Sequence, residues 1–154
     1  MSRQPNDDHV FYRNLNRYYP AVQRGEGIYL YDTEGKAYID GSGGAVVASL
    51  GHGLREIEEA MLTQLGNVAF AHGSQFTSPA AVALAERLVA MAPDNMKRVY
   101  FLSGGSEAVE TAVKMARQYQ VDRGKPMKYK VISRWPSYHG NTLGALALSG
   151  HTGR

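Results

Sequence analysis

Cysteine is absent from this sequence of 154 residues. Its absence excludes disulfide bonds, thiolate nucleophiles and metal or iron–sulfur sites with cysteine ligands. Long apolar runs are missing too, since stretches such as residues 45–50 and 80–85 are far shorter than the roughly 20 residues that cross a bilayer. The first residues also lack the apolar core of a secretion signal. We therefore expect a cytoplasmic protein with no membrane partner, whose chemistry depends on oxygen and nitrogen groups or on a cofactor.

An excess of charge of one sign is also lacking, because the formal net charge is only +3. A nucleic-acid-binding surface needs clustered cations, whereas the lysines and arginines here are scattered. Their densest run, residues 123–130, is interpreted as a solvated loop. No two histidines have the i, i+4 spacing of a helical metal pair. We therefore expect neither a nucleic-acid partner nor a metal site.

The first half of the chain combines an irregular arm, a hairpin and a helix. The first 25 residues show no sustained periodicity and predict the arm. Residues 27–31 and 36–40 are aromatic and β-branched and flank a Gly-containing turn, which is typical of a β-hairpin. Four residues with three glycines, 41–44, then predict a tight bend or a close approach of the backbone to a ligand. Apolar spacing over residues 54–65 predicts a helix that ends at Gly66.

The second half has the pattern of an α/β protein. Ser78 and Pro79 are in the positions that start a helix, and Pro93 ends it. Residues 98–102 and 129–133 are expected to be strands, separated by an amphipathic helix in which Glu110 and Lys114 can pair. A strand, a crossover helix and a second strand make a βαβ unit. The sequence therefore predicts a parallel sheet.

The segment Ser-Gly-Gly-Ser-Glu, residues 103–107, joins the first of these strands to the helix. Free amides at a helix N-terminus favour an anion, and glycines allow a phosphate to approach the backbone. The pattern alone leaves two interpretations open, a phosphate site and a simple helix cap. It matches neither the P-loop nor the dinucleotide-binding fingerprint.

The segment Trp-Pro-Ser-Tyr-His-Gly, residues 135–140, follows the second expected strand. Ligands of open α/β sheets bind at the carboxyl ends of the strands, so this loop and residues 103–107 are placed to share a pocket. Tyr138 could lie on a planar ring and His139 could hydrogen-bond beside it. A buried aromatic corner is the alternative. A Ser106–His139 hydrolase is disfavoured because the GxSxG elbow is missing.

Taken together, the motifs resemble class III aminotransferases that depend on pyridoxal phosphate. Residues 101–110 are similar to the family's SGSEA segment, and residues 138–142 to its YHG motif. Two earlier stretches agree, one from Leu30 to Gly53 and one over residues 72–78. Four segments in the same order cover nearly the whole chain, so the resemblance is specific although each motif alone is weak.

The resemblance implies a fold, a cofactor and an assembly. The fold would be the amino-terminal part of the fold-type I transferase fold, an α/β fold with parallel βαβ units. Residues 1–50 would form an arm and hairpin of the small domain, and residues 51–154 the beginning of the large cofactor-binding domain. The cofactor would be pyridoxal 5′-phosphate. The whole protein would act as a homodimer on an amino donor and a keto-acid acceptor.

The resemblance also implies roles for eight residues. The cofactor-binding residues would be Gly104, Gly105 and Ser106 around the phosphate, Tyr138 on the pyridine ring, and His139 and Gly140 beside it. Gly43 would lie at the substrate pocket, and Phe76 would belong to a segment that reaches the partner subunit. Many relatives have Ser where this chain has Gly104, which leaves backbone donors there.

The family's catalytic lysine has no counterpart in these residues. That lysine forms the Schiff base, and it lies on a motif well downstream of YHG, as does the acid that supports the pyridine nitrogen. None of the chain's lysines matches that motif. We therefore expect an amino-terminal fragment of a longer aminotransferase. The alternatives are an aminomutase, decarboxylase or racemase on the same scaffold, or a catalytically inactive fragment.

Overall fold

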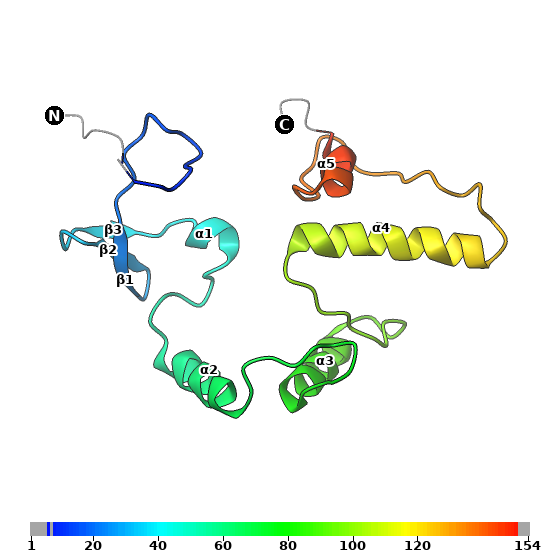
Figure 1. Ribbon diagram of the computed structural model, residues 1–154, viewed down its shortest axis with the longest axis horizontal. Helices are drawn as coiled ribbons and strands as arrows, with labels where there is room; N and C mark the ends of the chain where they lie inside the picture. The colour runs from blue at the N-terminus through cyan, green and yellow to red at the C-terminus, as the bar shows by residue number, and fades with distance from the viewer. Residues whose placement is uncertain (1–5, 7, 151–154) are drawn as a thin grey trace. The chain divides into compact units, whose positions relative to one another are not determined.

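The computed structural model describes Asn6 and residues 8–150, and the chain divides into two units, Met1–Thr77 and Ser78–Arg154. The division predicted after Leu50 concerns the domains of a whole subunit and stays a prediction. Figure 1 labels the elements of each unit. In the described part of the chain, no helix is long and apolar enough to cross a membrane.

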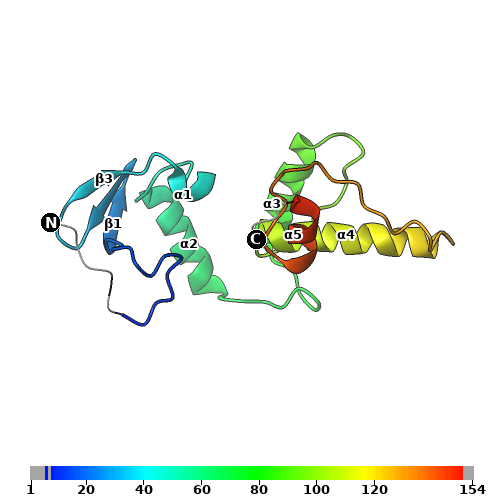
Figure 2. The same ribbon diagram turned by 90° about the horizontal axis from the view of Figure 1, so that it is seen from above.

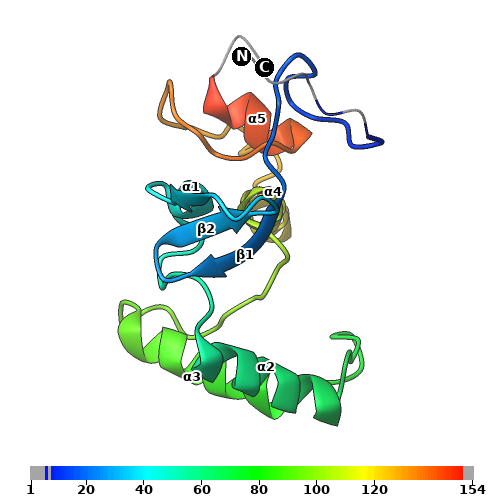
Figure 3. The same cartoon turned by 90° about the vertical axis from the view of Figure 1, so that its left-hand side faces the viewer.

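The first unit contains a small antiparallel sheet with the strand order β1-β2-β3. Its strands are β1 (Val22–Glu26), β2 (Tyr29–Asp32) and β3 (Ala37–Ile39). The pairing of β2 with β3 confirms the predicted hairpin. Figure 3 shows β1 and β2 side by side. The guanidinium of Arg24 on β1 lies 3.6 Å from the centre of the Tyr31 ring on β2.

Strand β1 begins inside the segment predicted to be an irregular arm, so that prediction is wrong for residues 22–25. The strand has one large apolar residue in five, and its backbone pairing with β2 shifts register between Val22 and Arg24. The sequence of β1 therefore lacks the alternation of apolar and polar residues that would predict a strand. The strand is defined by its backbone pairing with β2 and not by side-chain burial.

The hairpin turn is organised by the carboxylate of Asp32, which is 2% exposed. Its Oδ1 accepts the N–H groups of Glu34 at 3.0 Å and Lys36 at 2.9 Å, and its Oδ2 accepts the Tyr38 hydroxyl at 2.8 Å. Aspartate commonly organises turns in this way. This acid is therefore a structural residue of the turn.

The glycine-rich bend forms α1 (Gly43–Val46), a single left-handed turn. The φ angles are +52° at Gly43, +59° at Gly44, +65° at Ala45 and +68° at Val46. Glycine adopts these angles freely, but a left-handed conformation costs an L-residue about 1–2 kcal/mol. The predicted tight bend is confirmed. It continues through Ala45 and Val46, whose side chains disfavour left-handed backbone angles.

The long helix of the first unit is α2 (Arg55–Asn67), close to the predicted residues 54–65. The predicted end at Gly66 is wrong, because the helix continues through this glycine. Its C-cap, Val68, is extended, with φ −158°. A left-handed glycine is needed only where the chain reverses direction after a helix, and here the chain leaves in an extended conformation.

The second unit contains α3 (Pro79–Met91), α4 (Gly105–Asp122) and α5 (Leu143–Ser149). The predicted start of α3 is confirmed, since the Ser78 hydroxyl accepts the Ala81 N–H at 3.2 Å. In Figures 1 and 2, α5 lies beside the N-terminal end of α4. Residues 123–130 are exposed and irregular, which confirms the predicted loop.

The two expected parallel strands are not found in the described structure, so this prediction is corrected. Residues 98–102 and 129–133 have no strand pairing in the described structure. Tyr100 is 70% exposed and Ile132 is 99% exposed. Parallel strands are normally covered on both faces, and the described residues supply no such cover. Among the described residues, Ala145 is the only hydrophobic residue that is buried.

Candidate functional site

The N-terminus of α4 is open, as a phosphate site requires. Gly104 is its N-cap, with extended backbone and no side-chain cap among the described residues. The first helical hydrogen bond runs from the Ala108 N–H to the Gly104 carbonyl at 3.0 Å. The amides of Gly105, Ser106 and Glu107 precede it and have no partner within the helix. A Cβ on Gly105 would meet no atom within 4 Å, so this side of the turn is open.

The structure brings the two predicted motifs together at Ser106. Its hydroxyl accepts the Asn141 N–H at 2.9 Å. Gly140 packs directly on it, since a Cβ at Gly140 would lie 2.9 Å from the Ser106 Cα and 2.7 Å from the Ala145 Cβ. Gly140 has φ +141°, so both its angle and its surroundings require glycine. The expected proximity of residues 103–107 and 135–140 is therefore found.

A second contact between the same elements lies one helical turn further along α4. The Glu110 carboxylate accepts the Gly144 N–H at 2.7 Å. The Thr142 hydroxyl and this N–H hold the pKa of Glu110 below its ordinary value. The Thr142 oxygen does not reach full hydrogen-bond geometry with any described residue, so the Gly144 contact is the firmer one. The expected partner Lys114 makes no close ion pair with Glu110 among the described residues, but its charge also helps to lower the pKa of Glu110.

The loop that carries the predicted aromatic residue is held by the end of α5. The buried Ser149 accepts the Ser137 N–H with its carbonyl at 3.0 Å and the His139 N–H with its hydroxyl at 2.9 Å. Its own hydroxyl donates to the Ala145 carbonyl at 2.9 Å. The next residue, Gly150, has φ +67° and no room for a Cβ against the Trp135 ring.

The aromatic side chains of this loop are accessible. Trp135 is 70% exposed and Tyr138 is 62% exposed, so a buried aromatic corner is not what the described residues form. The His139 Nε2 lies 3.3 Å from the Arg134 carbonyl. Because a carbonyl only accepts, Nε2 carries the proton in this contact.

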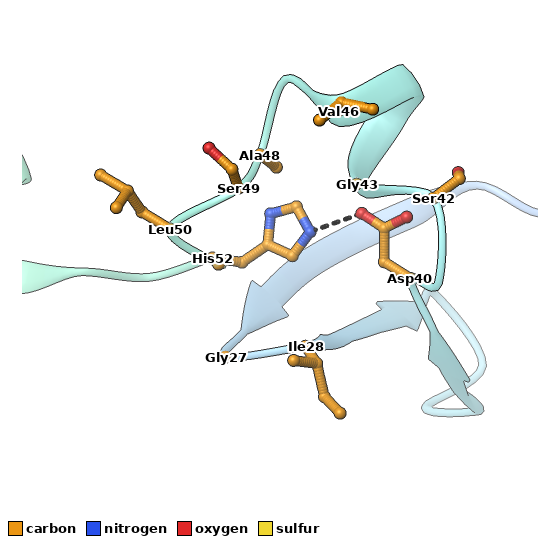
Figure 4. Close-up of a pocket in the computed structure, with 11 residues that line it drawn as sticks. Gly27, Ile28, Asp40, Ser42, Gly43, Val46, Ala48, Ser49, Leu50 and His52 are labelled. Carbon is orange, nitrogen blue, oxygen red and sulfur yellow. Dashed lines mark hydrogen bonds and ion pairs between the residues drawn. The ribbon is translucent and has the colours of Figure 1, made fainter.

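The two other predicted site residues lie in the first unit and are not brought together. Gly43 lines a hollow of about 390 Å³, in which Asp40 and His52 point toward each other (Figure 4). The Asp40 Oδ2 lies 2.9 Å from the His52 Nε2. Phe76 does not line this hollow and is 65% exposed.

Sequence reasoning missed α5, the contact of Glu110 with Gly144, the role of Ser149 and the Asp40–His52 pair. A signal for α5 was present, because Thr142 precedes an apolar run and Gly150 follows it, as N-cap and C-terminal glycine do. The pair had no signal, since residues twelve positions apart in a glycine-rich segment meet only through the fold.

Comparisons with known proteins agree with these motifs. The family profile "Aminotransferase class-III" matches residues 11–154. The chain is 48% identical over 136 residues to "Uncharacterized aminotransferase YodT" of Bacillus subtilis, covering 88% of this chain and 31% of that protein. It is 35% identical over 130 residues to "Putrescine--pyruvate aminotransferase" of Pseudomonas aeruginosa, covering 84% of this chain and 28% of that protein.

Solved structures show the same fold. The omega transaminase of Pseudomonas jessenii, solved in complex with PMP, superposes with a TM-score of 0.83 at 40% identity, over 87% of this chain and 30% of that one. The predicted fold class, the amino-terminal part of the fold-type I α/β fold, is confirmed by this likeness. The chain spans about 30% of the length of the relatives it matches.

Proposed function

Because the chain belongs to the class III aminotransferases, we propose that the protein of which it forms part transfers an amino group from an amine or amino acid to a keto acid. The observation that carries the proposal is the meeting of the open α4 N-terminus with the Tyr138 loop at Ser106. Cytoplasmic location and the homodimer remain predictions of the family resemblance.

Pyridoxal 5′-phosphate is the cofactor of this family. The residues present suit its phosphate, because three amides at the positive end of α4 have no helical partner and no side chain caps them in the described structure. When bound, this cofactor supplies an electron-withdrawing ring that carries the amino group between donor and acceptor.

In the proposed function, residues of this chain bind and orient the pyridoxal 5′-phosphate. The Gly104–Gly105 backbone lets an anion approach the helix end, and the Ser106 hydroxyl keeps its proton for donation while its oxygen accepts the Asn141 N–H. Tyr138 provides an exposed aromatic face for the ring. Gly140 packs against Ser106 and so lets the loop that carries His139 lie beside the start of α4. The lysine that completes the chemistry lies outside these residues.

The phosphate site is tested with pyridoxamine 5′-phosphate, which binds without a covalent link to lysine. The Ser106→Ala variant of the full-length protein loses a donor to a charged group, so its Kd should rise roughly 10- to 100-fold. Thr63→Ala is the control, because among the described residues the Thr63 hydroxyl donates only to the Glu59 carbonyl of its own helix. Equal affinity of wild type and Ser106→Ala would contradict the phosphate site.

The reaction is tested by supplying the full-length protein and pyridoxal phosphate with primary amines or amino acids and either pyruvate or 2-oxoglutarate. Formation of alanine or glutamate supports transamination. Release of CO₂, or a racemised or rearranged amino acid without transfer, would favour the decarboxylase, racemase or aminomutase alternative instead.

A further inference from the structure

Helix α5 has no side-chain cap of its own. Thr142 is at the N-cap position, yet its hydroxyl makes no capping hydrogen bond in the described structure, and the first turn of the helix has no acidic residue. The first amides of a helix find no acceptor within it, and the N-cap side chain ordinarily accepts one of them. With seven residues, α5 is also too short to be stable in isolation. Contacts from outside α5 must therefore hold it.

Glu110 of α4 supplies the missing acceptor. Its Oε1 accepts the Gly144 N–H at 2.7 Å. Gly144 is the second residue of α5, a position whose amide an N-cap side chain commonly bonds. A carboxylate near the N-terminus of a helix also interacts favourably with the helix dipole. Glu110 therefore caps a helix whose first turn lies 34 residues further along the chain.

The lack of a side chain at residue 144 makes this contact possible. A Cβ at Gly144 would lie 2.5 Å from the Glu110 Oε2 and 2.9 Å from its Oε1. Alanine at this position would favour the helical backbone of α5, but it would push the carboxylate away from the amide. The contact can therefore be broken from either side, at Glu110 or at Gly144.

The other end of α5 holds the loop that carries Tyr138. Ser149 is the last residue of the helix and is fully buried. Its carbonyl accepts the Ser137 N–H at 3.0 Å, and its hydroxyl accepts the His139 N–H at 2.9 Å. Both neighbours of Tyr138 are thus bonded to one residue of α5. The backbone of the loop is therefore fixed to this helix and follows its position.

Two hydrogen bonds one helical turn apart join α4 to this assembly, and Figures 1 and 2 show α5 beside this part of α4. Ser106 accepts the Asn141 N–H at 2.9 Å, and Glu110 accepts the Gly144 N–H. Residues four apart lie on the same face of a helix. A single attachment at Ser106 would let α5 swing about that point, whereas a second attachment at Glu110 sets its direction.

We propose that Glu110 is a positioning residue that caps α5 from α4 and thereby sets the orientation in which Tyr138 faces the N-terminus of α4. The contact of Tyr138 with the cofactor ring rests on the function proposed above. The link from Glu110 through Ser149 to the loop rests on the geometry of the second unit alone.

The link to the loop is tested first, by hydrogen–deuterium exchange of the full-length protein with no cofactor added. Glu110→Ala removes the acceptor, and the peptide that spans residues 137–141 should exchange roughly tenfold faster. Asp122→Ala is the matched control, because it removes an exposed carboxylate from the other end of α4. Exchange in α3 should stay as in the wild type. An equally large rise in α3 would show a general loss of stability and would overturn the proposal.

Gly144→Ala breaks the same contact while the carboxylate of Glu110 remains. Exchange of residues 137–141 should again be faster, although alanine favours the helix. Glu110→Gln keeps a neutral oxygen acceptor and should give a rate between those of the wild type and Glu110→Ala. Wild-type exchange in Glu110→Ala, or slower exchange than wild type in Gly144→Ala, would contradict the positioning role.

The effect on the ring is then measured as the Kd of pyridoxamine 5′-phosphate in a double-mutant cycle. Glu110→Ala should raise this Kd roughly 2- to 10-fold, the range expected for a lost contact between aromatic rings. In the Tyr138→Ala background the same change should leave the Kd almost unaltered, because no ring remains to be positioned. An equal factor in both backgrounds would show a merely structural role for Glu110. If the wild type does not bind pyridoxamine 5′-phosphate, the proposed function fails, while the exchange of residues 137–141 still decides the link to the loop.

Discussion

The Ser106 hydroxyl accepts a hydrogen bond from the Asn141 N–H, 35 residues further along the chain, at 2.9 Å. This bond joins the N-terminus of α4 to the loop that carries Tyr138. A hydroxyl that accepts one hydrogen bond still has its proton to donate. Ser106 can therefore bind a phosphate and hold the aromatic loop at the same time, so any change at this position should affect both.

Tyr138 is expected to contribute to cofactor binding through its aromatic ring rather than through its hydroxyl. Tyr138→Ala should weaken binding of pyridoxamine 5′-phosphate to the full-length protein roughly 2- to 10-fold, which corresponds to about 0.5–1.5 kcal/mol for stacked aromatic rings. Tyr138→Phe keeps the ring and should bind almost as well as the wild type. Fluorescence titration measures both constants. A Phe variant as weak as the Ala variant would assign the effect to the hydroxyl.

Gly140→Ala should destabilise the second unit. The added Cβ would lie 2.7 Å from the Ala145 Cβ and 2.9 Å from Ser106, at a φ of +141° that residues with a side chain avoid. Overpacking of this kind costs about 1–3 kcal/mol. Thermal unfolding of the full-length protein measures the loss.

Gly66→Ala provides the matched control for that experiment. Gly66 is inside α2, and a Cβ there would meet no atom within 4 Å. Alanine at a helix interior should stabilise by about 0.5–1 kcal/mol. Opposite signs for the two Gly→Ala changes are expected, and a loss of equal size in both would contradict the steric argument.

Glu110 should make stability depend on pH on the acid side. The Thr142 hydroxyl and the Gly144 N–H lower the pKa of Glu110 in the folded chain. A lowered folded pKa adds stability that is present above the unfolded value, about 4.3 for glutamate, and is lost as the pH falls through the folded value. Glu110→Gln should therefore lower Tm at pH 7 and have a smaller effect below pH 4.

Tm measured between pH 3 and pH 7 tests this expectation, with Glu59→Gln on α2 as the control. Glu59 is exposed, and its side chain has no hydrogen bond in the described structure. A Glu110→Gln variant whose Tm follows the wild-type pH curve in parallel would show that the carboxylate charge does not support the Gly144 contact.

Ser78 should stabilise α3 through its N-cap bond to Ala81. Ser78→Ala removes this acceptor and should cost about 1 kcal/mol of unfolding free energy, whereas Ser78→Asp keeps an acceptor and should cost little. Denaturant unfolding of the full-length protein compares the two. Equal losses in both variants would rule out capping as the cause.

The local elements were accessible to sequence reasoning wherever short-range chemistry determines them. The hairpin around Asp32, the Ser78 cap and the end of α3 before Pro93 each depend on side chains within a few residues. The two parallel strands were not predictable in the same way. Their apolar residues satisfy the pattern of buried strands, but strand pairing needs neighbours on both sides and cover on both faces.

The sequence by itself indicated the family, the glycine-rich start of α4 and the capacity of the glycines in residues 41–44 for left-handed angles, because motif order and glycine content are properties of the chain alone. Only the tertiary structure decided which distant groups meet: Ser106 with Asn141, Glu110 with Gly144, and Asp40 with His52. The reason is physical. Hydrogen bonds between residues 12 to 35 positions apart depend on how the elements pack, and no local preference of either residue encodes that partner.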